Sequence, residues 1–312
     1  MAEKIATRES YGNALAALGE KYDFVVLDAD LAAATKTGTF KKKFPERFFD
    51  CGIAEGNMMS VAAGIATTGK PVFASSFAMF AAGIAFEQII NSISYPNLNV
   101  MIGATHAGIT VGEDGATHQC LEDIALMRSI PGMIVINPAD DVEAKAAVEA
   151  ALNVNGPVYL RFGRMAVPVV NDAASYKFEL GKGVKLADGK DVTIVATGIM
   201  VDMALEAAKV LANEGISARV INIHTIKPLD KEIIAAAAKE TGAIVTAEEH
   251  NIYGGLGSAV AEAVCEACPV PVLRIGTEDV FGHSGKVPPL LEMYGLTVEN
   301  IVAKAKAAIA LK

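Results

Sequence analysis

The residues best suited to chemistry lie between positions 105 and 119, in the run THAGITVGEDGATHQ. Two imidazoles, from His106 and His118, share this segment with the carboxyl groups of Glu113 and Asp114 and with three glycines. Imidazoles and carboxylates exchange protons and hydrogen-bond hydroxyl groups, and glycines let a backbone approach a ligand closely. The same composition is also typical of a polar surface loop with glycines placed for turns, so both interpretations stay open at this point.

Two further segments carry candidate site residues. Glu55, in CGIAEGNM, stands between a predicted strand and the start of a predicted helix. A carboxylate there can serve a ligand or can simply complement the positive end of the helix dipole. Phe77 and Phe80, in SSFAMF, have the i, i+3 spacing that is usually typical of core packing. Taken singly, these residues favour structural roles.

The predicted elements place these candidates at one edge of a sheet. Apolar runs predicted as strands alternate with amphipathic stretches predicted as helices. Strands are expected at 24–27, 71–74, 99–104, 134–136 and 158–161, and helices after Glu55 and at 86–93, 121–130 and 140–151. Continuous apolar strands alternating with helices predict an α/β fold with a parallel sheet covered on both faces. Ligands bind such sheets at the carboxyl ends of the strands.

A second α/β unit is predicted after a break in this alternation. Turn-forming residues such as Pro168 and Asp188-Gly189 interrupt the pattern between 167 and 190, which we interpret as a linker. The alternation then resumes, with strands at 192–196, 219–223, 243–247 and 270–275 and helices at 202–213, 231–241 and 258–267. We therefore expect domains at 1–166 and 191–312, each a parallel or mostly parallel sheet with helices on both faces.

The length, net charge and apolar runs of the chain argue against some classes of binding partner. The 312 residues suffice for two domains, and the net charge of −9 argues against a nucleic-acid binder, which needs a basic face. No apolar run is long enough to span a bilayer, and the first residues lack the pattern of a signal peptide. We expect a cytoplasmic protein without nucleic-acid or membrane partners. Local arginines and histidines could still hold a small anion.

The four cysteines do not predict a metal site. Cys265 and Cys268 form a CxxC, but no second Cys or His pair stands at metal-binding spacing. This CxxC closes an alanine-rich helical pattern. We interpret these two thiols as buried or spectator thiols instead of metal ligands or redox groups.

Taken together, the motifs resemble one family. IAEGNMM, SSFAMF and GEDGATHQ have the order and separations of the pyrimidine-binding domain of transketolase and its thiamine-diphosphate relatives. TIVATG, at 193–198, resembles the opening of the transketolase C-terminal domain, and GEDG followed by THQ is typical of the transketolase branch. Transketolases hold the diphosphate and its divalent metal with a GDG motif, which this sequence lacks. The chain therefore resembles the C-terminal subunit of a split transketolase.

This resemblance implies a cofactor, a partner and an assembly. The expected fold is the thiamine-diphosphate-binding fold followed by a transketolase C-terminal domain. A separate N-terminal subunit would carry the diphosphate site and Mg²⁺ or another divalent metal, in an α2β2 heterotetramer. In the cofactor site, Glu55 matches the catalytic glutamate that hydrogen-bonds the pyrimidine ring. Phe77 and Phe80 match residues that pack around that ring, and Asp30 and Ile53 fall on the cofactor side.

The resemblance also implies a sugar-phosphate site. His106 and His118 match catalytic histidines that hydrogen-bond sugar hydroxyls and help to move protons. Asp114 matches an aspartate that binds the hydroxyl next to the aldehyde. Arg8 and Arg164 match arginines that hold the phosphate, a role that suits the guanidinium fork.

Some positions depart from the family pattern. Ala34 stands where a phosphate-contacting serine is expected, with Thr35 next to it, and Arg161 is the register alternative to Arg164. These departures leave the exact sugar open. Five further polar residues of the second domain are expected to have structural or surface roles: His224, Glu248, Glu249, His250 and His283.

Three other functions fit these motifs less well. Ketol transfer from pyruvate, as in deoxyxylulose-phosphate synthases, is disfavoured by His106, Glu113 and Asp114. A non-catalytic partner subunit is disfavoured by the presence of Glu55 and Phe77 together with both histidines. A nucleotide-binding Rossmann domain is the weakest alternative, because no GxGxxG follows a strand and opens a helix.

Overall fold

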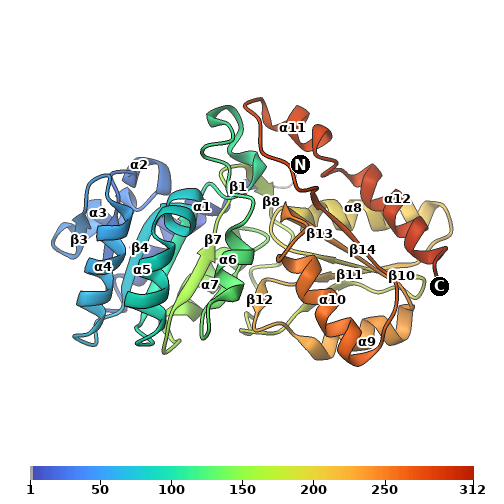
Figure 1. Ribbon diagram of the computed structural model, residues 1–312, viewed down its shortest axis with the longest axis horizontal. Coiled ribbons are helices and arrows are strands. Elements are labelled where there is room, and N and C mark those ends of the chain that lie inside the picture. Colours follow the sequence, from blue (N-terminus) through green and yellow to red (C-terminus); the bar gives the residue numbers. More distant parts are fainter. Residues whose placement is uncertain (1–2) are drawn as a thin grey trace.

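Short apolar runs form the strands of two main sheets in the computed structural model, which describes residues 3–312. The seven-stranded sheet has the order β12-β6-β7-β5-β4-β2-β3, and the five-stranded sheet has the order β14-β13-β10-β11-β9. Figure 1 shows the first sheet in blue to yellow-green, apart from its late strand β12, and the second sheet in yellow to red, each with helices against it. The prediction of two α/β units with helices on both faces of largely parallel sheets is confirmed.

The strands of the first sheet are buried because helices cover both faces. They are β2 (Val25–Asp28), β3 (Phe48–Asp50), β4 (Val72–Phe77), β5 (Val100–Thr105), β6 (Ile134–Ile136) and β7 (Val158–Arg161). Every neighbouring pair among these six strands is parallel. Every residue of β2, β4, β5 and β7 is buried, which explains why their sequences are continuous apolar runs instead of alternating ones.

Helices cover this sheet in two layers. They are α1 (Thr7–Leu18), α2 (Ala32–Thr35), α3 (Gly38–Lys43), α4 (Glu55–Ala66), α5 (Phe86–Gln88), α6 (Asp123–Ser129) and α7 (Asp141–Leu152). Helices α1 and α7 share one core with Phe73 and Met101 of the sheet, whereas α4 and α6 share another with Val72 and Ile102. Alternate residues of β4 and β5 thus face opposite layers. The segments 79–84 and 89–94 around α5 are π-helical.

The second sheet has a simpler arrangement. Its strands are β9 (Val184–Ala187), β10 (Val192–Ala196), β11 (Ala218–Asn222), β13 (Ile244–Asn251) and β14 (Val272–Thr277). Its helices are α8 (Met200–Asn213), α9 (Lys231–Thr241), α10 (Leu256–Ala267), α11 (Val287–Met293) and α12 (Val298–Ile309). Helices α8 and α12 share one core, and α9 and α10 contribute to another.

Four short strands run antiparallel, and the sequence pattern did not reveal them. Strand β12 (Thr225–Lys227) lies late in the chain but pairs with β6, at the edge of the first sheet. Strand β1 (Lys4–Ala6) pairs with β8 (Ala166–Pro168) as a separate ribbon. Strand β9, inside the segment expected as a linker, pairs with β11. The two units are therefore joined by main-chain pairing as well as by the connection between them.

No helix within residues 3–312 has both the length and the apolar content needed to cross a membrane.

Candidate functional site

The expected site residues follow the carboxyl ends of neighbouring parallel strands. Asp30 follows β2, Glu55 follows β3, and Phe77 is the last residue of β4. His106 follows β5, and Arg164 follows β7. Because these strands are parallel neighbours in one sheet, the five residues lie along the same edge. The expected residues thus share one edge of the first domain.

His106 is held by three contacts in an unusual backbone conformation. Its φ angle is 56°, in the left-handed region, and its ring stacks on Phe77 with a centroid distance of 3.8 Å. Its Nδ1 lies 2.9 Å from Thr105 Oγ1, and its Nε2 lies 2.9 Å from Nη1 of Arg8. An arginine can only donate, so Nε2 accepts and the ring proton is on Nδ1. Burial and the charges of Arg8 and Arg164 lower the pKa of His106 to about 3, so the ring is neutral.

Aromatic rings form a wall beside His106. Phe80 stacks on Phe77 with a centroid distance of 5.7 Å and an interplanar angle of 15°. His118 meets Phe80 edge-on at 5.3 Å and Phe77 at 6.3 Å. Its Nδ1 lies 2.9 Å from Thr117 Oγ1. The structure therefore brings both expected histidines and both expected phenylalanines together.

Glu55 lies buried at the first position of α4. The residue as a whole is only 6% exposed, but neither carboxylate oxygen is among the fully buried atoms, and no hydrogen bond or ion pair reaches them from another side chain within residues 3–312. A carboxyl group that reaches the surface of a largely buried residue without a protein partner is free to bind a ligand or a second protein surface. Next to it, Ile53 is 84% exposed.

Asp30 and the turn before Glu55 are tied together by Asp50. The Oδ1 atom of Asp50 accepts the backbone N–H of Asp30 at 3.1 Å and that of Gly52 at 3.0 Å. Asp30 itself is exposed and has a φ angle of 62°. The carboxyl ends of β2 and β3 are therefore fixed relative to each other, and Asp30 lies at the open edge of the sheet.

Two guanidinium groups give the site a positive side. Arg8 donates to Ala34 O at 3.1 Å, and its buried Nε has no partner among the residues described. Arg164 lies 3.7 Å from Asp114 and 4.0 Å from Glu113, and it donates to Val111 O. Burial and the charge of Arg164 both lower the pKa of Arg8. Two cations at one edge of the sheet favour the binding of an anion there.

Arg161 and Thr35 are engaged elsewhere. Arg161 is buried, with its Nε 2.8 Å from Asp123 Oδ2 and its Nη2 donating to Glu249 O at 2.9 Å. The hydroxyl of Thr35 is buried and donates to Asp28 at 2.7 Å. Arg161 is therefore not available to bind substrate in place of Arg164. Thr35 is likewise not available in place of the missing serine.

Asp28 is an organising residue that sequence reasoning missed. Its fully buried carboxylate accepts from Thr35 Oγ1 at 2.7 Å, Thr37 Oγ1 at 2.8 Å and Leu31 N at 2.6 Å. Burial raises the pKa of Asp28 to about 6 in spite of these hydrogen bonds. The result is a fixed turn at 31–37, whose Ala34 carbonyl in turn holds Arg8. The sequence signal that could have revealed this role is an aspartate at the end of an apolar strand, followed by a T-x-T sequence.

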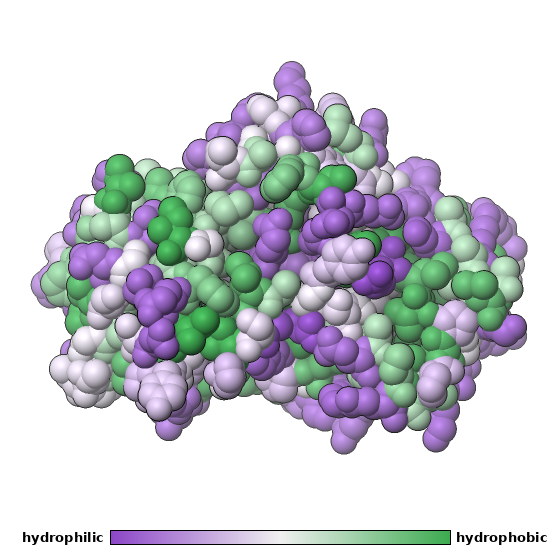
Figure 2. All heavy atoms as spheres, in the orientation of Figure 1, coloured by the Kyte–Doolittle hydropathy of each residue, from purple (hydrophilic) through white to green (hydrophobic). Residues whose placement is uncertain are grey.

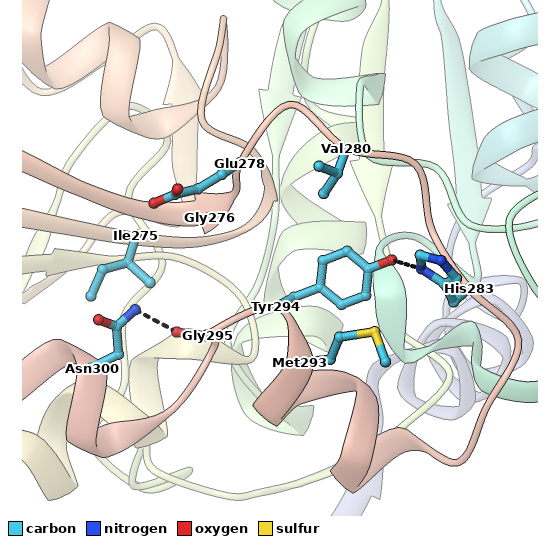
Figure 3. A pocket seen from close by; sticks show the side chains of 9 residues that line it. All are labelled: Ile275, Gly276, Glu278, Val280, His283, Met293, Tyr294, Gly295 and Asn300. Carbon is cyan, nitrogen blue, oxygen red and sulfur yellow. Dashed lines mark hydrogen bonds between the residues drawn. The ribbon is translucent and has the colours of Figure 1, made fainter.

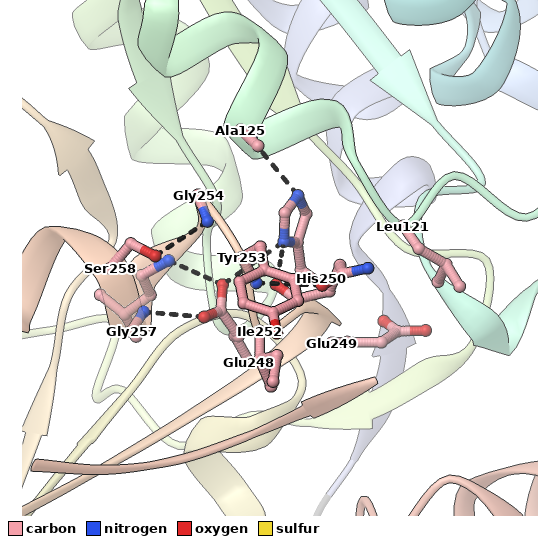
Figure 4. A network of polar contacts seen from close by, with 12 residues as sticks. Leu121, Ala125, Glu248, Glu249, His250, Ile252, Tyr253, Gly254, Gly257 and Ser258 are labelled. Atoms are coloured by element: carbon pink, nitrogen blue, oxygen red, sulfur yellow. Dashed lines mark hydrogen bonds and ion pairs between the residues drawn. The ribbon is translucent and has the colours of Figure 1, made fainter. Parts of the chain in front are cut away.

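A polar network from the second domain supports the loop after β5. Figure 4 shows that Glu248 turns toward the start of α10, where it accepts from Leu256 N and Gly257 N at 2.7 Å. Glu249 instead reaches the first domain and accepts from Thr110 N at 2.7 Å, while His250 Nε2 accepts from Ala125 N at 3.3 Å. Burial raises the pKa of Glu249 to about 7. All three side chains are thus engaged in hydrogen bonds within the protein.

A strap at 281–287 holds the GEDG loop from the other side. Ser284 Oγ donates to Glu113 O at 2.6 Å, and Gln119 Nε2 donates to His283 O at 2.9 Å. Figure 3 shows that the His283 ring turns toward Tyr294, at the edge of a hollow beside β14. His283 thus contributes its carbonyl to the loop, and Gln119 is a positioning residue that the sequence pattern did not reveal.

No group of three or more Cys, His, Asp or Glu side chains within the described part of the chain could hold a metal ion. Cys265 is exposed and Cys268 is partly buried, at the end of α10.

Comparison with known proteins places the chain in a family. The model of the transketolase pyrimidine binding domain matches residues 3–170, and that of the transketolase C-terminal domain matches residues 181–301.

Several similar proteins match over nearly their whole length. A transketolase C-terminal section of Methanocaldococcus jannaschii is 52% identical over 95% of this chain and 94% of its own length. A 6-deoxy-6-sulfo-D-fructose transketolase subunit of Clostridium sp. strain MSTE9 is 46% identical, over 96% of this chain and 92% of its own length. An apulose-4-phosphate transketolase subunit of Phocaeicola vulgatus is 39% identical, over 96% of this chain and 96% of its own length.

Solved structures agree. A chain described as a split gene transketolase, inactive β4 tetramer, is 55% identical with a TM-score of 0.93 over 99% of both chains. The transketolase of Campylobacter jejuni has a TM-score of 0.82 and 25% identity, and this chain covers 47% of it. The chain belongs to the transketolase family and corresponds to the C-terminal subunit of a split transketolase.

Proposed function

We propose that this chain forms the pyrimidine side of a two-chain transketolase that depends on thiamine diphosphate. The enzyme would move a two-carbon ketol unit from a ketose phosphate to an aldose phosphate. The proposal rests on the carboxyl group of the largely buried Glu55, which no other side chain contacts and which lies at the same sheet edge as the wall of Phe77 and Phe80. When bound, thiamine diphosphate supplies the nucleophilic carbon that such a transfer requires.

The residues present suit the pyrimidine end of this cofactor. A flat heteroaromatic ring needs apolar faces and one polar partner, which the two phenylalanines and Glu55 provide. Glu55 would hold a proton at a ring nitrogen, a role that an amide cannot fill. Ile53 and Asp30 would complete the cofactor side. The N-terminal subunit would supply the diphosphate site and the divalent metal, Mg²⁺ or another.

The sugar phosphate would lie between the histidines and the arginines. His106 is neutral, and its Nε2 lone pair already accepts from Arg8, so it would orient the substrate through polar contacts. His118 is half-buried, with Nδ1 occupied by Thr117, so its Nε2 would contact hydroxyl groups and move protons. Asp114 would bind the hydroxyl next to the aldehyde, and Arg8 and Arg164 would bind the phosphate.

An apolar surface beside Glu55 is where the second subunit would bind. Ile53, Val61 and Ile84 are exposed to 84%, 38% and 62% on or next to α4 and the π-helical segment after β4. On the face seen in Figure 2, hydrophobic residues lie among hydrophilic ones over the first domain. Apolar exposure of this kind is typical of a subunit interface. The similar solved chain is described as an inactive β4 tetramer, which supports a need for the other subunit. Two active sites, each formed by both kinds of subunit, would give an α2β2 assembly.

The test is reconstitution with the N-terminal subunit. Ketol transfer from xylulose 5-phosphate to ribose 5-phosphate is measured with thiamine diphosphate and Mg²⁺, for the mixture and for each chain alone. Activity of the mixture alone is the expected result. Activity of this chain alone would overturn the two-chain proposal.

Two controls separate the alternatives. Turnover of pyruvate with glyceraldehyde 3-phosphate would instead support decarboxylating ketol transfer. A stable complex that is inactive with all donors, including 6-deoxy-6-sulfo-D-fructose and apulose 4-phosphate, which are named for two relatives, would support a non-catalytic subunit.

A further inference from the structure

Lys36 lies in a turn that is built to hold it in place. It caps the end of α2 with a φ angle of 71°, in the left-handed region that residues with a Cβ rarely adopt. On either side of it, Thr35 and Thr37 donate to the buried carboxylate of Asp28, at 2.7 and 2.8 Å. A strained backbone held on both sides is more often found at functional sites than in ordinary surface turns.

Helix α1 packs its backbone directly against the backbone of this turn at Gly12. A Cβ added to Gly12 would lie 2.3 Å from Lys36 O and 2.6 Å from Lys36 Cβ, so only glycine fits there. This approach sends the Lys36 side chain along α1 toward its first turn. There the Nζ atom lies 3.5 Å from Oε1 of Glu9, the neighbour of Arg8 in sequence.

The Lys36 ammonium adds a third cation to the positive side of the site. Arg8 donates to Ala34 O, two residues before Lys36 in the same turn. The pKa of His106 is lowered first by burial, then by the charges of Arg8, Arg164 and His118, and least by that of Lys36. The Glu9 carboxylate that balances Lys36 is 47% exposed, and the Lys36 side chain is 32% exposed. Such an ion pair at the surface is weak and exchanges easily for a stronger anion.

We propose that Lys36 is a phosphate-binding residue, which leaves Glu9 and binds the terminal phosphate of the sugar together with Arg8 and Arg164. This inference rests on the proposed function, because the sugar phosphate is the ligand. A lysine at the end of a flexible stem supplies a mobile point charge, whereas the two arginines supply fixed forks. The hydroxyl of Thr35 cannot take this role, because it donates to Asp28.

The test compares phosphorylated with neutral acceptors in the reconstituted complex. For Lys36→Met, the ratio of kcat/KM for ribose 5-phosphate to that for glycolaldehyde should fall about tenfold, as for one charge-assisted contact, with the loss mainly in KM. Lys36→Arg should restore most of the ratio. Lys42→Met, which removes an exposed charge from α3, is the matched control and should leave the ratio unchanged.

Glu9→Gln separates phosphate binding from a surface ion pair. If Lys36 binds phosphate, this variant frees the ammonium and should keep or raise the ratio. An equal fall for Glu9→Gln and Lys36→Met, or an equal loss with both acceptors, would overturn the inference.

The role of Lys36 in phosphate binding can also be tested by measuring ligand binding, without enzymatic turnover. Calorimetric titration of the complex with ribose 5-phosphate and with ribose should show phosphate-dependent binding that Lys36→Met weakens. If the complex lacks transketolase activity but shows this difference, the phosphate site stands and the proposed reaction fails. If Lys36→Met binds ribose 5-phosphate as tightly as the unchanged protein, the inference fails.

Discussion

Arg8 points one nitrogen of its guanidinium, at 2.9 Å, to the Nε2 atom of His106. This contact decides which ring nitrogen carries the proton, because arginine has no lone pair to accept with. Thr105 completes the arrangement at Nδ1. His106 is therefore held as one neutral tautomer before any substrate arrives, and the two residues act as a unit.

The first prediction is that His106 stays neutral between pH 5 and pH 8. Its pKa of about 3 is set first by burial and then by Arg8. Arg8→Met should therefore raise this pKa, but burial should keep it below the ordinary value of 6.5. Imidazole nitrogen shifts in a ¹⁵N NMR titration measure both values. A titration of His106 near pH 6.5 in the unchanged protein would contradict the burial argument.

Glu55→Gln should lower kcat of the reconstituted complex by about 10² to 10⁴, as expected when a group that holds a reacting proton is lost. Glutamine has nearly the same shape but cannot accept and return a proton. Glu46→Gln, at an exposed position, is the matched control. If Glu55→Gln retains full activity while the complex still requires thiamine diphosphate, Glu55 does not hold the reacting proton.

The sheet edge could be predicted because its signals are local. His106 and Glu55 follow predicted strands, so short-range patterns suffice to put them at strand ends, whereas Phe77 was expected outside a strand that was predicted to end at residue 74. The parallel arrangement then follows from the helices between the strands. The sequence alone could not show how these side chains lie relative to one another. The resemblance to a known family indicated which of them share a site.

The missed features depend on contacts between distant residues. Arg161 donates to Glu249, 88 residues away, and nothing near either residue signals that contact. Strand β12 has three residues, too few to show a period, and its partner β6 lies in the other half of the chain. In the sequence, Asp28 is only the polar residue at the end of an apolar run. The fold shows that the hydroxyl groups of Thr35 and Thr37 both donate to it.

Arg161→Met should destabilise the fold by about 3–5 kcal/mol, because it leaves the buried Asp123 carboxylate unpaired. Lys70→Met is the control: Lys70 lies 2.8 Å from Asp23, the same separation as Arg161 from Asp123, but both partners are exposed. Little change is expected there, since water screens the pair. Urea unfolding of both variants measures the difference, and equal losses would contradict the role of burial.

Gly108→Ala should cost about 2–4 kcal/mol, the sum of a positive φ and an overlap in a packed joint. The φ angle of Gly108 is 81°, and an added Cβ would lie 2.2 Å from the carboxyl carbon of Glu249. Gly69→Ala isolates the backbone contribution, because Gly69 has a φ angle of 85° but an added Cβ there meets nothing within 4 Å. Thermal unfolding should show the larger loss for Gly108→Ala. A loss no larger than that for Gly69→Ala would mean that Glu249 moves aside freely.

The last prediction concerns a buried carboxyl group at the joint between the two sheets. Glu143 accepts from Tyr176 Oη at 2.5 Å and from Asn222 Nδ2 at 2.8 Å, yet burial raises its pKa to about 7. A carboxyl group whose folded pKa lies above its unfolded value of 4.5 stabilises the fold most below pH 4.5. That contribution is lost as the pH rises through about 7.

Tyr176→Phe removes a donor that stabilises the charged form of Glu143, so the pKa of Glu143 should rise further. The variant should therefore lose about 1–2 kcal/mol of stability at pH 8 and less at pH 5. Tyr22→Phe is the control, because its hydroxyl donates to Glu149 at 3.3 Å in a more exposed setting, and its effect should be small at both pH values. Urea unfolding at the two pH values measures the difference. An equal loss for Tyr176→Phe at pH 5 and pH 8 would mean that its hydroxyl stabilises the joint without regard to the charge of Glu143.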